Sequence, residues 1–138
     1  MQLSSFTDYG IRVLIYLAAL DQHTLTNIST VSQRYHISRN HLVKVVHKLG
    51  QLGYIETIRG KNGGIRLQKP AAQINIGEVI KLLEPLEILN CHLSFCHISP
   101  ECRLKGYLSD AKKAFLQALA QYTLADLVDD NPKLINLL

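Results

Sequence analysis

All three cysteines of the chain, Cys91, Cys96 and Cys102, lie in one short stretch with the sequence NCHLSFCHISPEC. Their spacing, Cys-x4-Cys-x5-Cys, is neither the CxxC pattern of zinc ribbons nor the cysteine run of bacterial ferredoxins. Three thiolates so close together in the sequence can still surround one soft metal ion or an iron–sulfur cluster. Residues 90–102 are therefore a candidate metal-binding loop.

The number of thiols bears on what such a site would do. Zinc and iron–sulfur clusters normally take four protein ligands, so three cysteines leave one position to another group. His92 or His97 could complete a zinc site. In a cluster, the fourth iron would be open or weakly held, and nitric oxide or dioxygen would react there first. Three thiols thus suit a sensor, while a zinc site and three cysteines without any metal stay open as alternatives.

The composition and the first residues argue against export and membrane insertion. The start, MQLSSFTDYG, lacks the basic segment of an export signal, and the longest apolar run, Val13 to Leu20, is too short to cross a bilayer. We therefore expect a cytoplasmic protein with no membrane partner, in which the thiols stay reduced. The odd number of cysteines also argues against a fold built on disulfides.

Apolar periodicity predicts the elements that position the cysteine loop. Helices are expected over residues 5–20, 28–35, about 38–52, 76–83 and about 100–120, with a last helical turn at 124–128. The second and third of these, separated by a short turn, form a helix-turn-helix candidate. Residues 54–69 then predict two strands around RGKNGG, where Asn62-Gly63 favours a tight hairpin turn. A helix-turn-helix followed by a basic hairpin is typical of a winged helix.

The predicted fold is mainly α-helical with a small β-hairpin: a winged helix-turn-helix plus a long dimerisation helix. We expect one compact unit, in which residues 1–70 form the DNA-binding region, and residues 71–138 carry the cluster-binding loop 90–102 and the dimerisation helix. The apolar stripe of the helix at about 100–120 is longer than so small a domain needs internally. This favours a dimer helix, and packing of the stripe onto the chain's own core is the alternative.

Charge is distributed unevenly along the chain. Residues 1–69 contain nine Lys or Arg and three acidic residues, whereas the remainder contains six and eight. A basic region on a winged helix predicts double-stranded DNA as partner, against the alternative of an ordinary solvated face. The side chains expected to read bases are Arg39, Asn40, His41 and Lys44, and those expected to contact phosphates or an adjacent minor groove are Lys48, Arg59, Lys61 and Asn62.

Over nearly its whole length the chain resembles the NsrR branch of the BadM/IscR/NsrR group of bacterial winged-helix repressors. The resemblance is carried by MQLSSFTDYGIRVLIYLA, SRNHLVKVVHKLGQLGYIETIRGKNGGIRL and LEPLEILNCHLSFCHISPECRLKGYLSDA. It implies a homodimeric repressor with one iron–sulfur cluster per subunit on Cys91, Cys96 and Cys102, with 4Fe–4S preferred and 2Fe–2S open. It also implies that nitric oxide attacks the cluster and releases operator DNA, which derepresses nitric oxide detoxification genes.

The resemblance also bears on the fourth ligand. The IscR-like pattern has a histidine three residues after the third cysteine, where this chain has Lys105, and this difference argues against that branch. In NsrR-like proteins an N-terminal aspartate of the partner subunit can complete the cluster, and Asp8 stands at the matching position. The alternative for Asp8 is an acidic residue favoured by the helix dipole in the first turn.

Other classes of function have less support. A cysteine nucleophile needs a base and an orienting group, and no signature of a substrate pocket accompanies His92 and His97, so we expect that the chain is not an enzyme. The alternatives are an iron–sulfur redox or iron regulator of the same fold, and a zinc-stabilised DNA-binding module without a sensing role.

Overall fold

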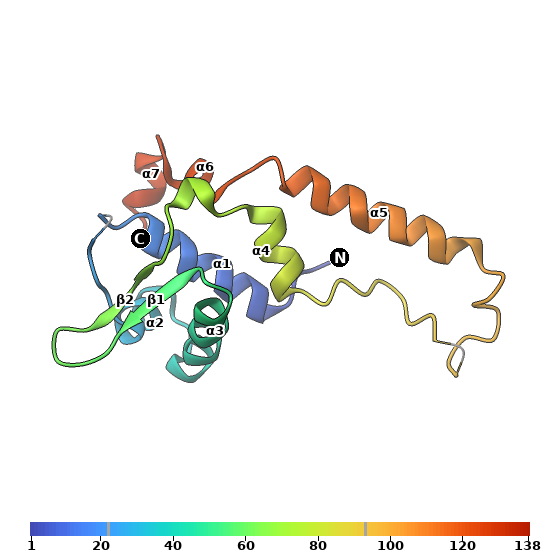
Figure 1. Cartoon of the computed structure of the whole chain (residues 1–138), viewed down its shortest axis with the longest axis horizontal. Helices are drawn as coiled ribbons and strands as arrows, with labels where there is room; N and C mark the ends of the chain where they lie inside the picture. The colour runs from blue at the N-terminus through green and yellow to red at the C-terminus, as the bar shows by residue number, and fades with distance from the viewer. Residues whose placement is uncertain (22, 93) are drawn as a thin grey trace.

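The computed structural model describes residues 1–21, 23–92 and 94–138. Its helices are α1 (Ser5–Ala18), α2 (Ile28–Tyr35), α3 (Arg39–Gln51), α4 (Ile76–Leu83), α5 (Arg103–Leu119), α6 (Leu124–Val128) and α7 (Pro132–Ile135); the other elements are strands β1 (Ile55–Ile58) and β2 (Gly64–Leu67) and the 3-10 helix η1 (Ala71–Gln73). Figure 1 shows a mainly helical chain with one antiparallel hairpin. The predicted fold class is confirmed.

Local hydrogen bonds explain the helix boundaries that differ from the predicted ones. The first helix ends at Ala18 rather than Leu20, because the N–H of Leu20 donates to the carbonyl of Leu17 in a tighter turn. The long helix begins at Arg103 rather than near residue 100. The chain just before it is still in a turn, in which the N–H of Glu101 donates to the carbonyl of Ile98 at 3.1 Å.

The turn between α2 and α3 is held by backbone geometry and one serine. His36 adopts the left-handed conformation (φ 53°), which ends α2 and redirects the chain. The hydroxyl of Ser32 donates to the carbonyl of Ile37 at 2.6 Å, and the N–H of Ile37 donates back to the carbonyl of Ser32 at 3.1 Å. Ser38 then caps α3 by accepting the N–H of His41. The two helices therefore meet at a defined angle.

The wing is a hairpin in which Ile55 pairs with Leu67 and Ile58 with Gly64. Its turn is not the tight Asn62-Gly63 turn predicted from the sequence, because the loop between the paired strands spans residues 59–63. Gly60 supplies the positive φ (104°), and Gly63 is required for space, since a Cβ there would lie 2.0 Å from the carbonyl oxygen of Ile58. The loop thus presents its basic residues on a wider tip.

A third segment extends the hairpin. The N–H of Thr26 donates to the carbonyl of Ile65 at 3.1 Å, and the N–H of Ile65 donates to the carbonyl of Thr26 at 2.8 Å. This bridge joins the segment before α2 to β2. The wing is consequently anchored to the helix-turn-helix through its backbone.

The hydrophobic core draws residues from both predicted regions, 1–70 and 71–138. Leu14 of α1, Leu42 and Leu49 of α3, Val79 of α4 and Leu124 of α6 are fully buried within it. The strand residues Ile55 and Ile65 close it beneath the wing. A shared core couples the helix-turn-helix and the wing to α4 and α6, while the division at residue 70 itself stays a prediction.

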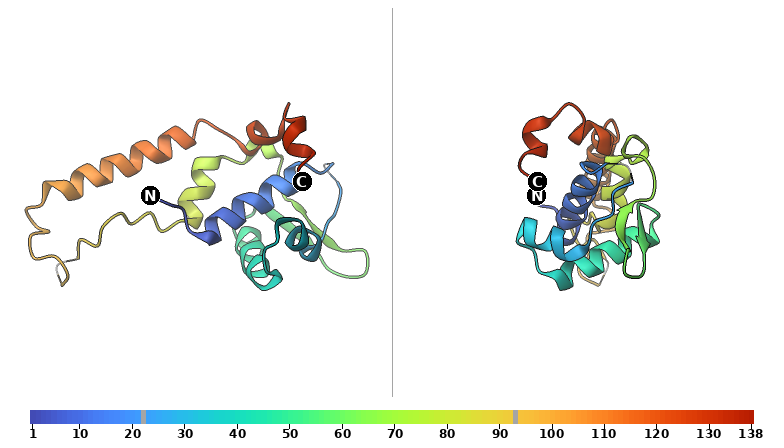
Figure 2. Two further views of the ribbon diagram at one scale, coloured as in Figure 1. Left: turned by 180° about the vertical axis from the view of Figure 1, so that it is seen from behind. Right: turned by 90° about the vertical axis from the view of Figure 1, so that its left-hand side faces the viewer.

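The last part of the chain extends away from this core. Figures 1 and 2 show α5 projecting from the rest, with the chain that follows α4 (residues 84–92 and 94–102) leading out to its far end. The helix has no buried residue; Phe115, Leu116 and Leu119, all towards its C-terminal end, pack partly against the core. No helix in the described part of the chain is long and apolar enough to span a membrane.

Candidate functional site

The outer face of α3 carries the side chains predicted to read bases. Arg39, Asn40, His41 and Lys44 are all exposed, while the opposite face buries Leu42, Val45, Val46 and Leu49 in the core. The guanidinium of Arg39 donates to the hydroxyl of Ser29 on α2 at 3.1 Å. The N-terminal half of α3 thus presents donors and acceptors of the kind that bind base edges in a major groove.

The residues predicted to contact phosphates or a minor groove lie on either side of this face. Arg59, Lys61 and Asn62 are exposed at the tip of the wing. Lys48, in the last turn of α3, is half-buried, so its stem packs on the protein and its ammonium group reaches the surface. The helix-turn-helix and the hairpin that carry these residues have the order of a winged helix.

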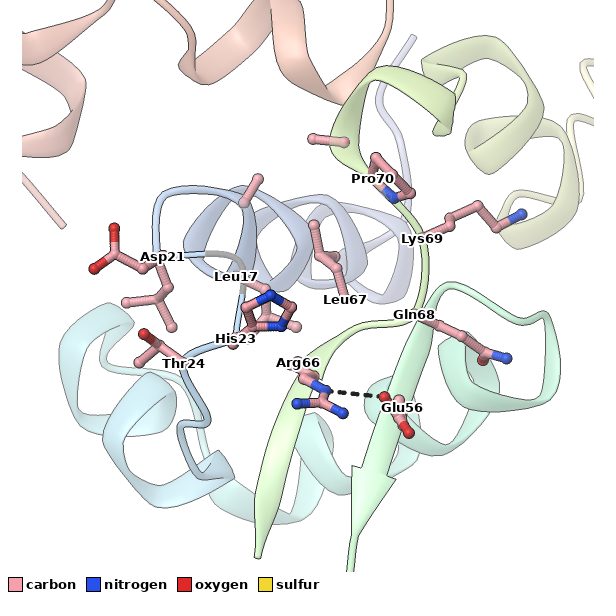
Figure 3. A pocket seen from close by; sticks show the side chains of 13 residues that line it. Leu17, Asp21, His23, Thr24, Glu56, Arg66, Leu67, Gln68, Lys69 and Pro70 are labelled. Atoms are coloured by element: carbon pink, nitrogen blue, oxygen red, sulfur yellow. Dashed lines mark hydrogen bonds and ion pairs between the residues drawn. The ribbon is translucent and has the colours of Figure 1, made fainter.

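One ion pair and one cation–π contact stiffen the base of the wing. Arg66 on β2 donates to the Glu56 carboxylate on β1 at 2.9 Å, directly across the hairpin. The ammonium of Lys69 lies 4.9 Å from the ring centroid of Tyr54, which is buried. Figure 3 shows the ion pair at the edge of a hollow of about 410 Å³ between the wing and the end of α1. These contacts join the two sides of the hairpin to each other.

The cysteine loop lies at the other end of the molecule from the wing (Figure 1). Cys91, Cys96 and Cys102 all carry free thiols and are half-buried. The N–H groups of Phe95 and Cys96 donate to the carbonyl of His92 at 2.9 and 2.8 Å. The loop is therefore a series of tight turns that ends at Cys102, the residue that precedes α5.

Ser99 connects two parts of this loop. It is only 6% exposed, and its hydroxyl donates to the carbonyl of Cys91 at 2.6 Å. Its N–H donates to the carbonyl of Cys96 at 3.2 Å. One buried serine thus keeps the backbone of the first cysteine beside the turn that carries the second.

The donor chemistry of the loop fits an iron–sulfur cluster or zinc, because both bind thiolates. Cys91 and Cys102 line one open hollow of about 890 Å³, and Lys105 lines it with them, whereas Cys96 does not. Within residues 1–21, 23–92 and 94–138, no three His, Cys, Asp or Glu side chains gather closely enough to hold a metal ion. Binding by all three cysteines therefore requires the loop to rearrange so that the three thiols come together.

Asp8 lies on α1 and not in the loop. Its carboxylate accepts a hydrogen bond from the guanidinium of Arg12 at 3.0 Å, and both side chains are partly exposed. This hydrogen bond raises the pKa of Arg12. In the single chain Asp8 is thus an ion-pair partner in the first turn of a helix, and the structure does not bring it to the three cysteines.

Two contacts on α1 were not predicted from the sequence. The ring of Tyr9 stacks on the ring of His41 with centroids 6.2 Å apart, which joins α1 to the base-reading end of α3. The carboxylate of Glu84, just after α4, accepts hydrogen bonds from the N–H and the hydroxyl of Ser4, both at 2.9 Å. Neither pair has a sequence signal, because its partners meet only through tertiary packing.

Comparison with known proteins assigns the family. A family model described as "Rrf2: Iron-dependent Transcriptional regulator" matches residues 3–130. The chain belongs to the Rrf2 family. As an Rrf2 protein it is a DNA-binding regulator of transcription, and members of this family are not enzymes.

Solved structures of Rrf2-like regulators superpose on almost the entire chain. CymR of Staphylococcus aureus is 25% identical with a TM-score of 0.72, covering 91% of this chain and 97% of its own. CymR of B. subtilis, described as the global cysteine regulator, is 26% identical with a TM-score of 0.72, covering 93% and 96%. IscR of T. potens, at 22% identity, a TM-score of 0.74 and coverage of 94% and 88%, supports the fold alone.

Proposed function

We propose that this Rrf2 regulator is a nitric-oxide-sensitive iron–sulfur repressor that binds operator DNA as a homodimer. The observation that carries the proposal is the set of three free, half-buried thiols in the loop that leads directly into α5. The description of the family model as iron-dependent agrees with a metal-binding loop of this kind. Lys105, at the position of the IscR-like histidine, favours the NsrR-like branch over the IscR-like one.

In this proposal Cys91, Cys96 and Cys102 of one subunit hold the cluster, 4Fe–4S rather than 2Fe–2S, and Asp8 of the partner subunit completes it. Iron in such a cluster supplies a site that reacts with nitric oxide. The loop lies far from the wing of its own chain (Figures 1 and 2), so a ligand from the partner offers a direct route to the DNA-binding surface.

The contacts of Asp8 suggest how that route reaches the DNA. To serve as a ligand, Asp8 would have to share its carboxylate with Arg12, with which it makes an ion pair at 3.0 Å in the single chain. The next residue, Tyr9, stacks on His41 at the base-reading end of α3. A change at the start of α1 is thereby passed to the recognition helix through one aromatic contact.

The DNA-binding part of the proposal assigns a role to each exposed group. Arg39, Asn40, His41 and Lys44 contact base edges; Lys48 contacts a phosphate; and Arg59, Lys61 and Asn62 enter an adjacent minor groove. Two copies of α3 in a homodimer would bind half-sites about one helical turn apart. Nitric oxide lowers the affinity for the operator because, once the cluster is lost, the separation and tilt of the two copies of α3 are no longer fixed.

The test is anaerobic purification followed by a visible absorption spectrum and analysis of iron, sulfide and zinc. We expect a brown protein whose absorbance bleaches with nitric oxide, and whose operator affinity, measured by fluorescence anisotropy before and after, falls in step. A colourless protein with one zinc per chain would contradict the proposal and leave a zinc-stabilised DNA-binding module.

A second candidate, an iron or redox regulator of the same fold, is favoured by the description of the family model as iron-dependent. The same purified protein distinguishes the two. In the second candidate, dioxygen or an iron chelator releases the DNA at least as effectively as nitric oxide does. In the first, nitric oxide acts at stoichiometric amounts and the chelator acts slowly.

A further inference from the structure

We infer that Ser99 is the positioning residue of the cysteine loop: its buried hydroxyl holds the backbone of Cys91 against the turn that carries Cys96. The part of this inference that concerns retention of a bound metal rests on the proposed function and deepens it. The part that concerns the order of the metal-free loop is independent of the proposed function. Ser99 is distinct from the ligands, because its hydroxyl bonds a backbone carbonyl and not a metal donor.

Burial is the first observation behind this inference. Ser99 and Thr7 are the buried polar residues of the described chain, while the other described residues between 87 and 101 are exposed or half-buried. A serine is seldom buried unless its hydroxyl has a hydrogen-bond partner. Here that partner is the carbonyl of Cys91 at 2.6 Å. The loop thus has a small interior, and Ser99 occupies it.

The second observation is that both hydrogen-bonding groups of Ser99 converge on cysteine residues. The hydroxyl reaches Cys91 and the N–H reaches the carbonyl of Cys96 at 3.2 Å. Ser99 also lines the hollow that Cys91 and Cys102 share. A single residue therefore contacts the backbone of two cysteines and lies beside the third.

The consequence is pre-organisation. A flexible segment that closes around a metal loses conformational entropy on binding, and this loss weakens the affinity. With the backbones of Cys91 and Cys96 already held together by Ser99, less of the loop has to be ordered when the three thiols close around a metal. Ser99 therefore slows the release of a bound metal without contacting it.

Ser99→Ala removes the hydroxyl with little change of shape, and Ser94→Ala, at an exposed serine of the same loop, is the matched control. The first measurement is hydrogen–deuterium exchange of residues 94–102 in the metal-free protein. We expect Ser99→Ala to speed exchange there by a factor of about five, the equivalent of about 1 kcal/mol for one hydrogen bond, and Ser94→Ala to leave it unchanged. Ser99→Thr, which retains the hydroxyl, should restore slow exchange.

The second measurement is the release of iron from loaded protein to a chelator, which should be faster in Ser99→Ala than in Ser94→Ala. Equal exchange in all variants would overturn the inference. Faster exchange with unchanged iron release would overturn the part that concerns metal retention. If neither the wild type nor any variant binds iron, the proposed function fails. Faster hydrogen–deuterium exchange in Ser99→Ala would then still support the role of Ser99 in the loop. Unchanged circular dichroism and melting temperature establish that the variants fold.

Discussion

At the scale of single residues, the proposed function divides the chemistry between a metal-binding loop and a DNA surface. The three cysteines supply soft ligands, and their free, half-buried state leaves them available to a metal. Asp8 is a hard donor already paired with Arg12 at 3.0 Å. A carboxylate in competition with an ion pair is a weak ligand for iron, and such a ligand suits a site that must be lost on demand.

Cys96→Ala tests the role of a single residue, because it removes one of the three thiols that would bind the cluster. We expect the variant to bind no stable cluster and its operator affinity to fall by a factor of about 5 to 150, the usual range for coupling between two sites. Iron analysis and fluorescence anisotropy measure the two effects. A Cys96→Ala protein that represses a reporter fully in cells would contradict the sensing role of the loop.

At the scale of elements, α3 and the wing form the proposed DNA surface, and their packing sets its shape. The exposed face of α3 lies opposite a fully apolar face, so the orientation of its basic residues is determined by the burial of Leu42, Val45 and Leu49. The wing is fixed by the Thr26–Ile65 bridge and the Glu56–Arg66 ion pair. We therefore expect base specificity to depend on the N-terminal half of α3, and general DNA affinity to depend on Lys48 and the tip of the wing.

Asn40→Ala and Lys48→Ala separate these two contributions on the same helix. Asn40→Ala should weaken the free energy of binding to the cognate operator by about 1–3 kcal/mol and relax the base preference at one base pair. Lys48→Ala should weaken binding to all DNA sequences alike. It should also reduce the slope of log affinity against log salt concentration by about one. Titrations of cognate and scrambled duplexes at several salt concentrations measure both. A loss of base preference in Lys48→Ala would reverse the assignments.

The contact between the start of α1 and the end of α4 gives a prediction of pH dependence. Partial burial raises the pKa of the Glu84 carboxyl, but hydrogen bonds from Thr7 and Ser4 lower it by more, so the pKa lies below its ordinary value. A group with a lowered folded-state pKa contributes stability above its unfolded pKa of about 4.3, and this contribution is lost as pH falls through the folded value.

Glu84→Gln should therefore lower the free energy of unfolding at pH 7 by an amount on the order of 1 kcal/mol, and the difference from wild type should shrink in acid. Urea unfolding at pH 7 and at about pH 3 measures it. Glu87→Gln, at an exposed carboxylate of the same segment, is the control. A difference that stays constant with pH would show that the Ser4–Glu84 contact is not electrostatic in origin.

At the scale of the whole molecule, the helix α5 is incompletely covered by its own chain. Its C-terminal end packs on the core through Phe115, Leu116 and Leu119, so the alternative of internal packing holds for that half. Leu104 and Tyr107 in its first half are 47% and 64% exposed. Exposed apolar side chains on a projecting helix favour a second copy of the chain as the occupant, in agreement with an Rrf2 regulator, which is often dimeric.

The double variant Leu104→Glu/Tyr107→Glu should be monomeric in light scattering, because two carboxylates would be buried in the dimer interface. Loss of the second half-site contact should lower operator affinity by a factor of about 100 or more. Leu137→Glu, at an exposed leucine outside α5, is the control and should remain dimeric. A double variant that stays dimeric would place the subunit interface elsewhere.

The sequence by itself determined most of the elements, though not η1 or α7, together with the winged-helix order and the position of the cysteine loop. Caps such as Ser38, apolar faces such as that of α3, and the clustering of Cys91, Cys96 and Cys102 are local patterns that recur with period 3.6 or within a few residues. Besides the helix boundaries at Ala18 and Arg103, one local prediction was wrong: the Asn62-Gly63 turn, which depended on strand register, and the pairing of Ile58 with Gly64 decides that register.

Only the tertiary structure decided which residues meet across the chain. Three such contacts are Ser4 with Glu84, Tyr9 with His41, and the buried hydroxyl of Ser99 with the carbonyl of Cys91. The separation of the partners along the sequence carries no periodic signal. The folded chain also decided that α5 is covered only at one end, because the depth of the core and not the apolar stripe limits how much of a helix is buried. Local patterns determine elements, and packing determines their neighbours.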